Sequence, residues 1–192
     1  DEVQPGFART GQGFFGFARH GIVPDMITMG KPMGNGIPIS GLAAKEDVLA
    51  AFSDKLPYFN TFGGNPVSIA AAQAVLKYIK DENLQEHCKK AGAALLKALK
   101  EVQERHPESV GDVRGAGLFL GFEFVKNDGN KTPDKDMALN VIEMLRDEHI
   151  LTSVIGHYGN ILKLRPPMVF SENDIDWFAT SLDKCITKLE NK

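Results

Sequence analysis

Lys31 is the residue whose type and surroundings point most directly to chemistry. It is followed within five residues by Pro32, Gly34 and Gly36, and the preceding residues 25–29 favour a short buried strand. A lysine at the end of such a strand lies where open α/β sheets bind their ligands. A partly desolvated lysine there can act as a Schiff-base nucleophile, whereas the alternative is a loop lysine beside a tight turn. The segment alone leaves both interpretations open.

Two further segments carry long motifs. The chain opens with DEVQPGFARTG at residues 1–11, and residues 60–66 have the sequence NTFGGNP. Together with the MGKPMGNG run at residues 29–36, and in this order, these motifs resemble those of the class III pyridoxal-phosphate-dependent aminotransferases. The chain is most similar to the branch that contains alanine–glyoxylate aminotransferase-like proteins and the phospho-lyases of phosphoethanolamine and phosphohydroxylysine. The runs shared with that branch are MGKPMGNG, YFNTFGG and NILK.

The resemblance implies a binding site for pyridoxal 5′-phosphate. This cofactor needs a lysine on its aldehyde, an acid at its pyridine nitrogen, a partner for its phenolic oxygen and donors for its phosphate. By the resemblance, Lys31 binds the aldehyde and later moves a proton as the catalytic acid and base, and Asp1 pairs with the ring nitrogen. Val3 packs on one ring face, and Gln4 donates a hydrogen bond to the phenolic oxygen. Without the motif, these three would be a solvated aspartate, a core valine and a loop amide.

The cofactor segments contain two residues that differ from the family pattern and a threonine that is a candidate to bind the phosphate. Pro5 and Ala8 differ from the TGFG pattern usual in the family, so the shape of this loop is not predicted. In the family, the threonine matching Thr61 binds the cofactor phosphate of the neighbouring subunit, which implies a homodimer or higher homo-oligomer. A hydroxyl and exposed N–H groups in a Gly-rich loop before a helix suit an anion. The alternative for Thr61 is an N-cap or turn threonine for the helix expected from Pro66.

Three cations are candidates for the substrate side of the site. In many family members, an arginine at the position matching Lys163 grips the substrate carboxylate with a bidentate fork, which lysine cannot reproduce. This difference agrees with the NILK likeness to the phospho-lyases. Arg165 is the second candidate, with a structural surface arginine as its alternative, and Arg114 is more often structural in the family. The implied substrates are small amines and oxo acids.

Composition excludes several classes of protein. The chain has 192 residues, 43% hydrophobic and 24% charged, with a formal charge of −3. These values are ordinary for a globular protein and give no basic footprint for nucleic acid. No apolar run is long enough to span a membrane. We expect Cys88 and Cys185 to be reduced structural thiols, and the five histidines show no metal-ligand spacing.

The expected fold class is α/β: part of the fold-type I PLP-dependent transferase large domain, followed by a small C-terminal α+β domain. Residues 1–80 would be the C-terminal part of the large domain, and residues 81–192 the small domain. The first residues have the pattern of a strand end, and family members carry a long N-terminal half before them. We therefore expect a C-terminal portion of a larger, cytoplasmic protein, with a mitochondrial location left open. The expected strands are 26–29, 39–44, 118–125 and 161–164, and the expected helices are 46–52, 66–79, 84–106, 136–148 and one opened by Ser171.

Three functions remain open at this point. The first is a PLP-dependent enzyme that moves an amino group from an amine or amino acid to a 2-oxo acid. The second keeps the same cofactor and lysine but eliminates phosphate and ammonia from a phosphorylated amine such as phosphoethanolamine. The third is a non-catalytic fragment that does not bind the cofactor by itself.

Overall fold

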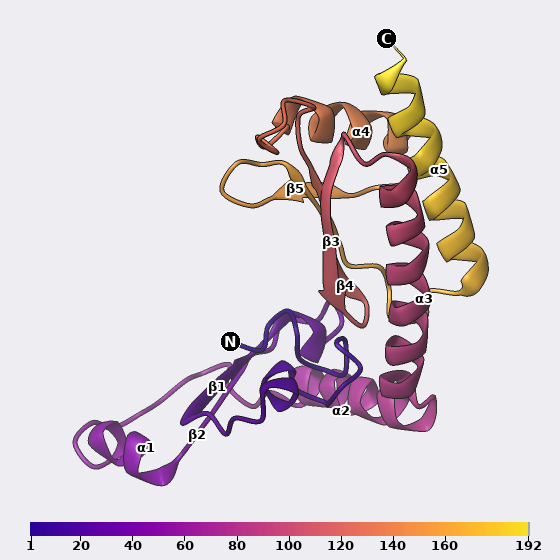
Figure 1. Cartoon of the computed structure of the whole chain (residues 1–192). Coiled ribbons are helices and arrows are strands. Elements are labelled where there is room, and N and C mark those ends of the chain that lie inside the picture. Colours follow the sequence, from indigo (N-terminus) through magenta and orange to yellow (C-terminus); the bar gives the residue numbers. More distant parts are fainter. Residues whose placement is uncertain (192) are drawn as a thin grey trace. The chain divides into compact units, whose positions relative to one another are not determined.

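The computed structural model describes residues 1–191 and divides into two compact units (Figure 1). Unit 1 comprises Asp1–Glu86 and unit 2 comprises His87–Lys192. The division falls in the first turn of α3, which begins at Leu84. That unit 1 belongs to a large cofactor domain and unit 2 to a small domain remains a proposal, as does the boundary expected at residue 80.

Unit 1 is built on a two-stranded antiparallel sheet, β1 (Met26–Met29) and β2 (Gly41–Ala44), both labelled in Figure 1. Met29 pairs with Gly41. Two short 3-10 helices, η1 (Gly16–His20) and η2 (Lys31–Met33), flank β1 in sequence. The expectation that β1 is buried is wrong, since Met26 is exposed and the strand has one partner only. β2 begins two residues later than predicted because the chain opposite turns into η2 after Met29.

Two helices complete unit 1, and both begin close to the predicted residues. α1 spans Glu46–Ser53 and has two acidic residues in its first turn. α2 spans Pro66–Asp81, with Pro66 in the first turn, where a missing N–H costs nothing. The side chain of Asn65 accepts the N–H of Ser68 at 2.9 Å and is therefore the N-cap of α2.

Unit 2 contains a four-stranded antiparallel sheet in the order β3-β4-β6-β5. The strands are β3 (Val110–Ala116), β4 (Phe119–Phe124), β5 (Ser153–Ile155) and β6 (Ile161–Leu164). The sequence predicted β4 and β6 but missed the two edge strands. β3 contains two glycines and an irregular pairing between Val110 and Asp112, and β5 has only three residues, so neither shows a clear two-residue period.

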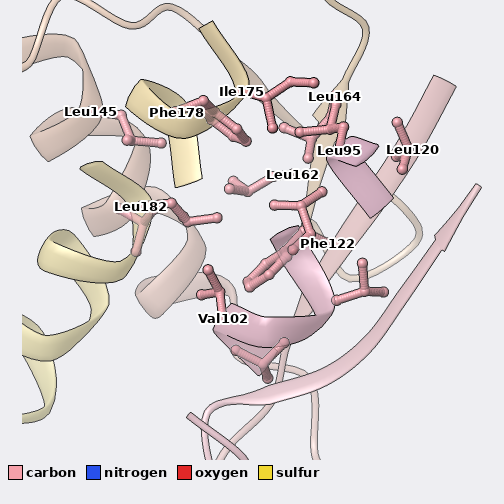
Figure 2. Close-up of a cluster of buried hydrophobic side chains, with 14 of the residues drawn as sticks. Leu95, Val102, Leu120, Phe122, Leu145, Leu162, Leu164, Ile175, Phe178 and Leu182 are labelled. Carbon is pink, nitrogen blue, oxygen red and sulfur yellow. The ribbon is translucent and has the colours of Figure 1, made fainter. Parts of the chain in front are cut away.

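Three long helices contribute to the core of unit 2: α3 (Leu84–Arg105), α4 (Lys135–Asp147) and α5 (Glu172–Glu190). One face of β4 and β6 is buried and the other half-buried, as expected for an antiparallel sheet covered on one side. Figure 2 shows side chains from this face packed against residues of all three helices, among them Phe122, Leu162 and Leu182. The predicted capping box of α5 is confirmed by reciprocal bonds between Ser171 and Asp174.

A buried histidine joins the end of α3 to α5, and the two helices run side by side in Figure 1. His106 Nδ1 lies 2.7 Å from a carboxylate oxygen of Glu190, and its Nε2 lies 3.1 Å from Asp183. Asp183 also accepts a hydrogen bond of 2.7 Å from Nε of Arg105. Burial raises the pKa of Asp183, but the hydrogen bonds from Arg105 and His106 outweigh it, so the pKa lies below its usual value.

Neither a spanning helix nor a metal cluster is found in the part of the chain that the structure describes. Among residues 1–191, none of the helices combines the length and apolar character needed to cross a bilayer. The same residues contain no group of three histidine, cysteine, aspartate or glutamate side chains arranged to hold a metal ion. Both cysteines are free thiols and buried, Cys88 on α3 and Cys185 on α5. Burial raises the pKa of the Cys185 thiol, which makes its reactive thiolate rarer.

Candidate active site

Lys31 lies directly after β1 and opens the short helix η2. Its φ of +33° is in the left-handed region, which side chains other than glycine rarely adopt. Asn35, four residues later, also has a positive φ, of +45°. Backbone strain of this kind costs about 1–3 kcal/mol per residue and concentrates at ligand sites. The strand-end position predicted for Lys31 is confirmed, and the sequence did not reveal its left-handed backbone.

The first residues of the chain run beside the strand that leads to Lys31. The N–H of Glu2 donates to the carbonyl of Thr28 on β1 at 2.9 Å. A methyl group placed on Gly30 would lie 3.8 Å from Cγ2 of Val3, so Val3 is next to the residue that precedes Lys31. The exposed Asp1 accepts the N–H of Val3 on its Oδ1 at 2.8 Å. Asp1 and Val3 therefore flank the end of β1, and Gln4 follows them, half-buried.

The loop after these residues is strained at a position where this chain differs from the family pattern. Phe7 and Ala8 both have left-handed backbones, with φ of +57° and +68°. Ala8 is fully buried and stands where the family pattern has glycine. A left-handed alanine costs about 1–2 kcal/mol more than a right-handed one. The loop thus keeps a conformation suited to glycine, and Phe7 packs its ring 5.3 Å from that of Phe14.

A cavity of about 730 Å³ brings Lys31 together with the loop of residues 60–65. Its remaining lining comes from residues 36–40 and the start of α2. The volume is in the range usual for small-molecule sites. The Oδ1 atom of Asn60 accepts the N–H groups of Phe62 and Gly63 at 3.1 and 3.0 Å. Two N–H groups of the Gly-rich loop are therefore bonded to Asn60, and the anion site expected in this loop stays a prediction.

Thr61 occupies a turn at the tip of this loop and is exposed. It is not among the residues that line the cavity of Lys31 in unit 1. The alternative that Thr61 caps the helix from Pro66 is wrong, since Asn65 is the N-cap. A turn threonine remains, whose hydroxyl does not contribute to the cavity beside its own Lys31.

The substrate-side cations predicted from the sequence all lie in unit 2. Lys163 is on the half-buried face of β6, paired with Gly121 on β4 and Ser153 on β5. Lys163 and Arg165 line one cavity of about 480 Å³, whose lining also contains Trp177 and no carboxylate. An anion with an apolar portion suits such a lining.

Arg114, the third cation, is a structural residue in this fold. Its guanidinium binds Asp112 at 2.6 Å and Glu123 at 2.5 Å. The hydrogen bonds to Glu123 and Asp112 raise its pKa above the usual arginine value. Its charge is thus balanced by two carboxylates of the same sheet, which agrees with the structural role expected for it.

Comparison with known proteins identifies the family. A sequence profile described as aminotransferase class-III matches residues 1–186. The chain belongs to the class III aminotransferase family. It is 44% identical over 190 residues to ethanolamine-phosphate phospho-lyase homolog 1 of Caenorhabditis elegans, covering 97% of this chain and 40% of that protein. It is 40% identical over 189 residues to the mitochondrial alanine–glyoxylate aminotransferase 2 homolog 2 of Arabidopsis thaliana, covering 98% and 39%.

Solved structures agree with this class III assignment. A phospholyase from Arthrobacter in complex with phosphoethanolamine matches with a TM-score of 0.93 and 40% identity, covering 97% of this chain and 44% of that one. A transaminase from the marine bacterium Virgibacillus matches with a TM-score of 0.90 and 31% identity, covering 100% and 45%. The chain spans about 40% of the length of the curated relatives that it matches. The predicted family and the α/β fold class are confirmed.

The residues of unit 1 fit pyridoxal phosphate in part. Lys31 lines a cavity of suitable size. The carboxylate of Asp1 and the side chain of Val3 lie beside the same strand end but are not among the residues that line this cavity. The lysine and the carboxylate are two of the four groups that the cofactor requires. The N–H groups of Phe62 and Gly63, bound by Asn60, are not arranged for its phosphate.

The residue that sequence reasoning missed is Glu2. It is buried, with 4% of its surface exposed, and both oxygens of its carboxylate are bound by backbone N–H groups. Its type gave no warning, because a glutamate beside an aspartate ordinarily belongs to a solvated surface.

Proposed function

We propose that this chain is part of a PLP-dependent enzyme in which Lys31 binds the cofactor aldehyde. The observation that carries the proposal is the place of Lys31: at a strand end, on a strained backbone, in a cavity shared with the loop of residues 60–65. Lys31 lies within residues 1–186, which match the class III profile. The activity proposed first is transfer of an amino group from an amine or amino acid to a 2-oxo acid.

Three side chains near the strand end would hold the cofactor. Bound PLP withdraws electrons from the carbon that bears the substrate amine, which makes a proton on that carbon acidic. Asp1 would keep the ring nitrogen protonated by its negative charge, Val3 would support one face of the ring, and Gln4 would donate to the phenolic oxygen. The Nζ atom of Lys31 would take the acidic proton from the substrate carbon as a general base and then donate it to a different carbon as a general acid.

Elimination of phosphate is the second candidate, and Lys163 favours it. Where many class III aminotransferases have an arginine for the substrate carboxylate, this chain has a lysine, which binds phosphate as a point charge. Lys163 and Arg165 line the same cavity of unit 2, and we propose that they bind the anionic group of the substrate. Two of the similar proteins are named for phospho-lyase chemistry, one of them in complex with phosphoethanolamine.

We further propose that the active unit is a homodimer. Thr61 is exposed and stands outside the lining of its own Lys31 cavity, which suits a hydroxyl that serves the phosphate of a neighbouring subunit. The cytoplasm is the proposed location, with mitochondria as the alternative, since one similar protein is named mitochondrial.

A substrate panel on the full-length protein separates the candidates. Aminotransfer predicts product formation that depends on an added 2-oxo acid, whereas the lyase predicts release of inorganic phosphate and ammonia from phosphoethanolamine without one. Lys31→Ala should abolish either activity and the visible absorbance of the bound cofactor, while Lys45→Ala, at an exposed lysine of the same unit, should retain both. A wild-type protein that shows no visible band and no turnover would support the non-catalytic interpretation and contradict the proposal.

A further inference from the structure

Glu2 is a buried carboxylate that accepts hydrogen bonds from the backbone of another segment. Its Oε2 accepts the N–H of Gly16 at 2.6 Å, and its Oε1 accepts the N–H of Phe17 at 3.0 Å. These N–H groups are the first two of η1, whose N-cap residue Phe15 provides no side-chain cap. Since a buried carboxylate is costly unless its oxygens are bonded, this arrangement satisfies both Glu2 and the start of η1.

The backbone closes tightly around this side chain. A methyl group on Gly16 would lie 2.5 Å from Cβ of Pro5 and 3.3 Å from Oε2 of Glu2. A methyl group on Gly6 would lie 2.5 Å from the carbonyl oxygen of Glu2. Neither position has room for a side chain, so the carboxylate is held in one place by the chain around it.

The backbone of Glu2 links this anchor to the strand that leads to Lys31. Its N–H donates to Thr28 on β1, and its carbonyl accepts the N–H of Gly6 at 3.1 Å. The chain enters a turn at Val3, directly after this anchor. Val3 adjoins Gly30, and Asp1 accepts the N–H of Val3, so the anchored Glu2 lies between these two residues.

We propose that Glu2 is a positioning residue, whose carboxylate fixes the segment carrying Asp1 and Val3 against the end of β1 beside Lys31. The inference rests on the proposed function, because it assigns Glu2 a role through two residues expected to contact PLP. Glu2 would act through these two residues, since its own carboxylate is buried and bound by the N–H groups of Gly16 and Phe17. Its effect is to keep the Asp1 carboxylate and the Val3 side chain in register with Lys31.

Glu2→Gln tests the role with little change in size. An amide has one acceptor oxygen, so its NH2 group would face one of the two N–H groups that the carboxylate now accepts. We expect kcat, measured per cofactor-loaded site, to fall by about tenfold to a hundredfold with a smaller change in KM. The visible spectrum of bound PLP should also shift, because Asp1 moves relative to the ring nitrogen. Glu46→Gln, at an exposed glutamate in the first turn of α1, is the matched control and should change neither.

A second measurement requires no cofactor. In the PLP-free protein, hydrogen exchange at Gly16 and Phe17 should accelerate in Glu2→Gln and stay unchanged in Glu46→Gln. If Glu2→Gln does not fold, Glu2→Asp keeps both acceptor oxygens on a shorter side chain. We expect this variant to show the spectral shift with a smaller loss of kcat.

The outcomes distinguish this inference from the proposed function. A folded Glu2→Gln or Glu2→Asp protein with wild-type kcat and spectrum would show that Glu2 is only structural, and would overturn the inference while the proposed function stands. A wild-type protein that binds no PLP would overturn the proposed function and this role with it. Loss of stability with unchanged kcat per loaded site also contradicts positioning.

Discussion

Phe122 in unit 2 and Phe59 in unit 1 are the same residue type in opposite surroundings. Phe122 is fully buried in a cluster that includes residues from every long helix of unit 2, whereas Phe59 is 85% exposed. Several other large apolar side chains of unit 1 are exposed as well, among them Tyr58, Phe62 and Val67. Large exposed apolar surfaces in proteins commonly mark interaction sites. Unit 2 is thus stabilised by its own core, while unit 1 leaves much of its apolar surface uncovered.

The two units also differ in where residues other than glycine have left-handed backbone conformations. In unit 1, residues other than glycine adopt left-handed backbones at Lys31, next to the candidate cofactor segment at Phe7 and Ala8, and at Asn35 and Asn83. Unit 2 follows amphipathic helices and an alternating sheet, with left-handed residues of this kind at Lys131 and His149. Strained backbones concentrate at ligand sites, so the strained residues of unit 1 agree with a ligand site beside Lys31, whereas the regular elements of unit 2 build a core.

The largest effect is expected from separating the two units. A chain of residues 84–192 retains α3 and the whole buried cluster, which extends from Cys88 to Ile186, and should unfold cooperatively with urea. A chain of residues 1–83 should show no cooperative transition, because it has few buried apolar residues. Circular dichroism during urea titration measures both. Equal cooperativity in the two pieces would contradict the comparison.

Single truncations make the same comparison within the full-length protein. Phe122→Ala should lower the free energy of unfolding by about 3–5 kcal/mol, since it leaves a cavity in a packed core. Phe59→Ala should change it by less than about 0.5 kcal/mol. Denaturant titration of the two variants provides the measurement. A large loss of stability in the Phe59 variant would show that unit 1 is packed by contacts outside this chain.

The elements of unit 2 could largely be predicted from the sequence, whereas the contacts of the candidate site in unit 1 could not. Helical periodicity gave α3, with Leu84, Leu95, Leu99 and Val102 on its buried face, and Ser171 correctly marked the start of α5. The strands β3 and β5 were missed because glycines and short length remove the alternation that reveals a strand. An element was therefore predicted where its residues show a clear local period, and missed where they do not.

The candidate site was less accessible to sequence reasoning. The strand-end position of Lys31 could be predicted, because the residues before and after it have clear propensities. The burial of Glu2 and the binding of the Phe62 and Gly63 N–H groups by Asn60 could not, since they depend on contacts that no local pattern records. The roles of Asp1, Val3, Gln4, Thr61, Lys163 and Arg165 stay predictions.

A smaller effect is expected from pH, and it belongs to unit 2. The pKa of Asp183 is lowered in the folded protein by Arg105 and His106 in spite of burial. A lowered folded pKa contributes stability that is present above the unfolded value, which is near 3.8, and is lost as the pH falls through the folded value. Asp183→Asn should therefore be less stable than wild type at pH 7 by less than about 1 kcal/mol, and the difference should shrink below pH 4.

Urea midpoints of the two proteins from pH 7 to pH 3 measure this dependence. Asp25→Asn, at an exposed ion pair with Lys45 in unit 1, is the control and should have little effect on stability. A constant difference between wild type and Asp183→Asn across this range would show that the carboxylate acts through packing instead of charge.

The central claim is that Lys31 is the lysine that binds PLP, and reductive labelling tests it most directly. The full-length protein, loaded with PLP, is treated with sodium borohydride, digested and mapped by mass spectrometry. The account predicts a stable pyridoxyl group on the peptide that contains Lys31, loss of the visible band on reduction, and no such label in Lys31→Ala. A label on another lysine, or a visible band that survives in Lys31→Ala, would contradict it.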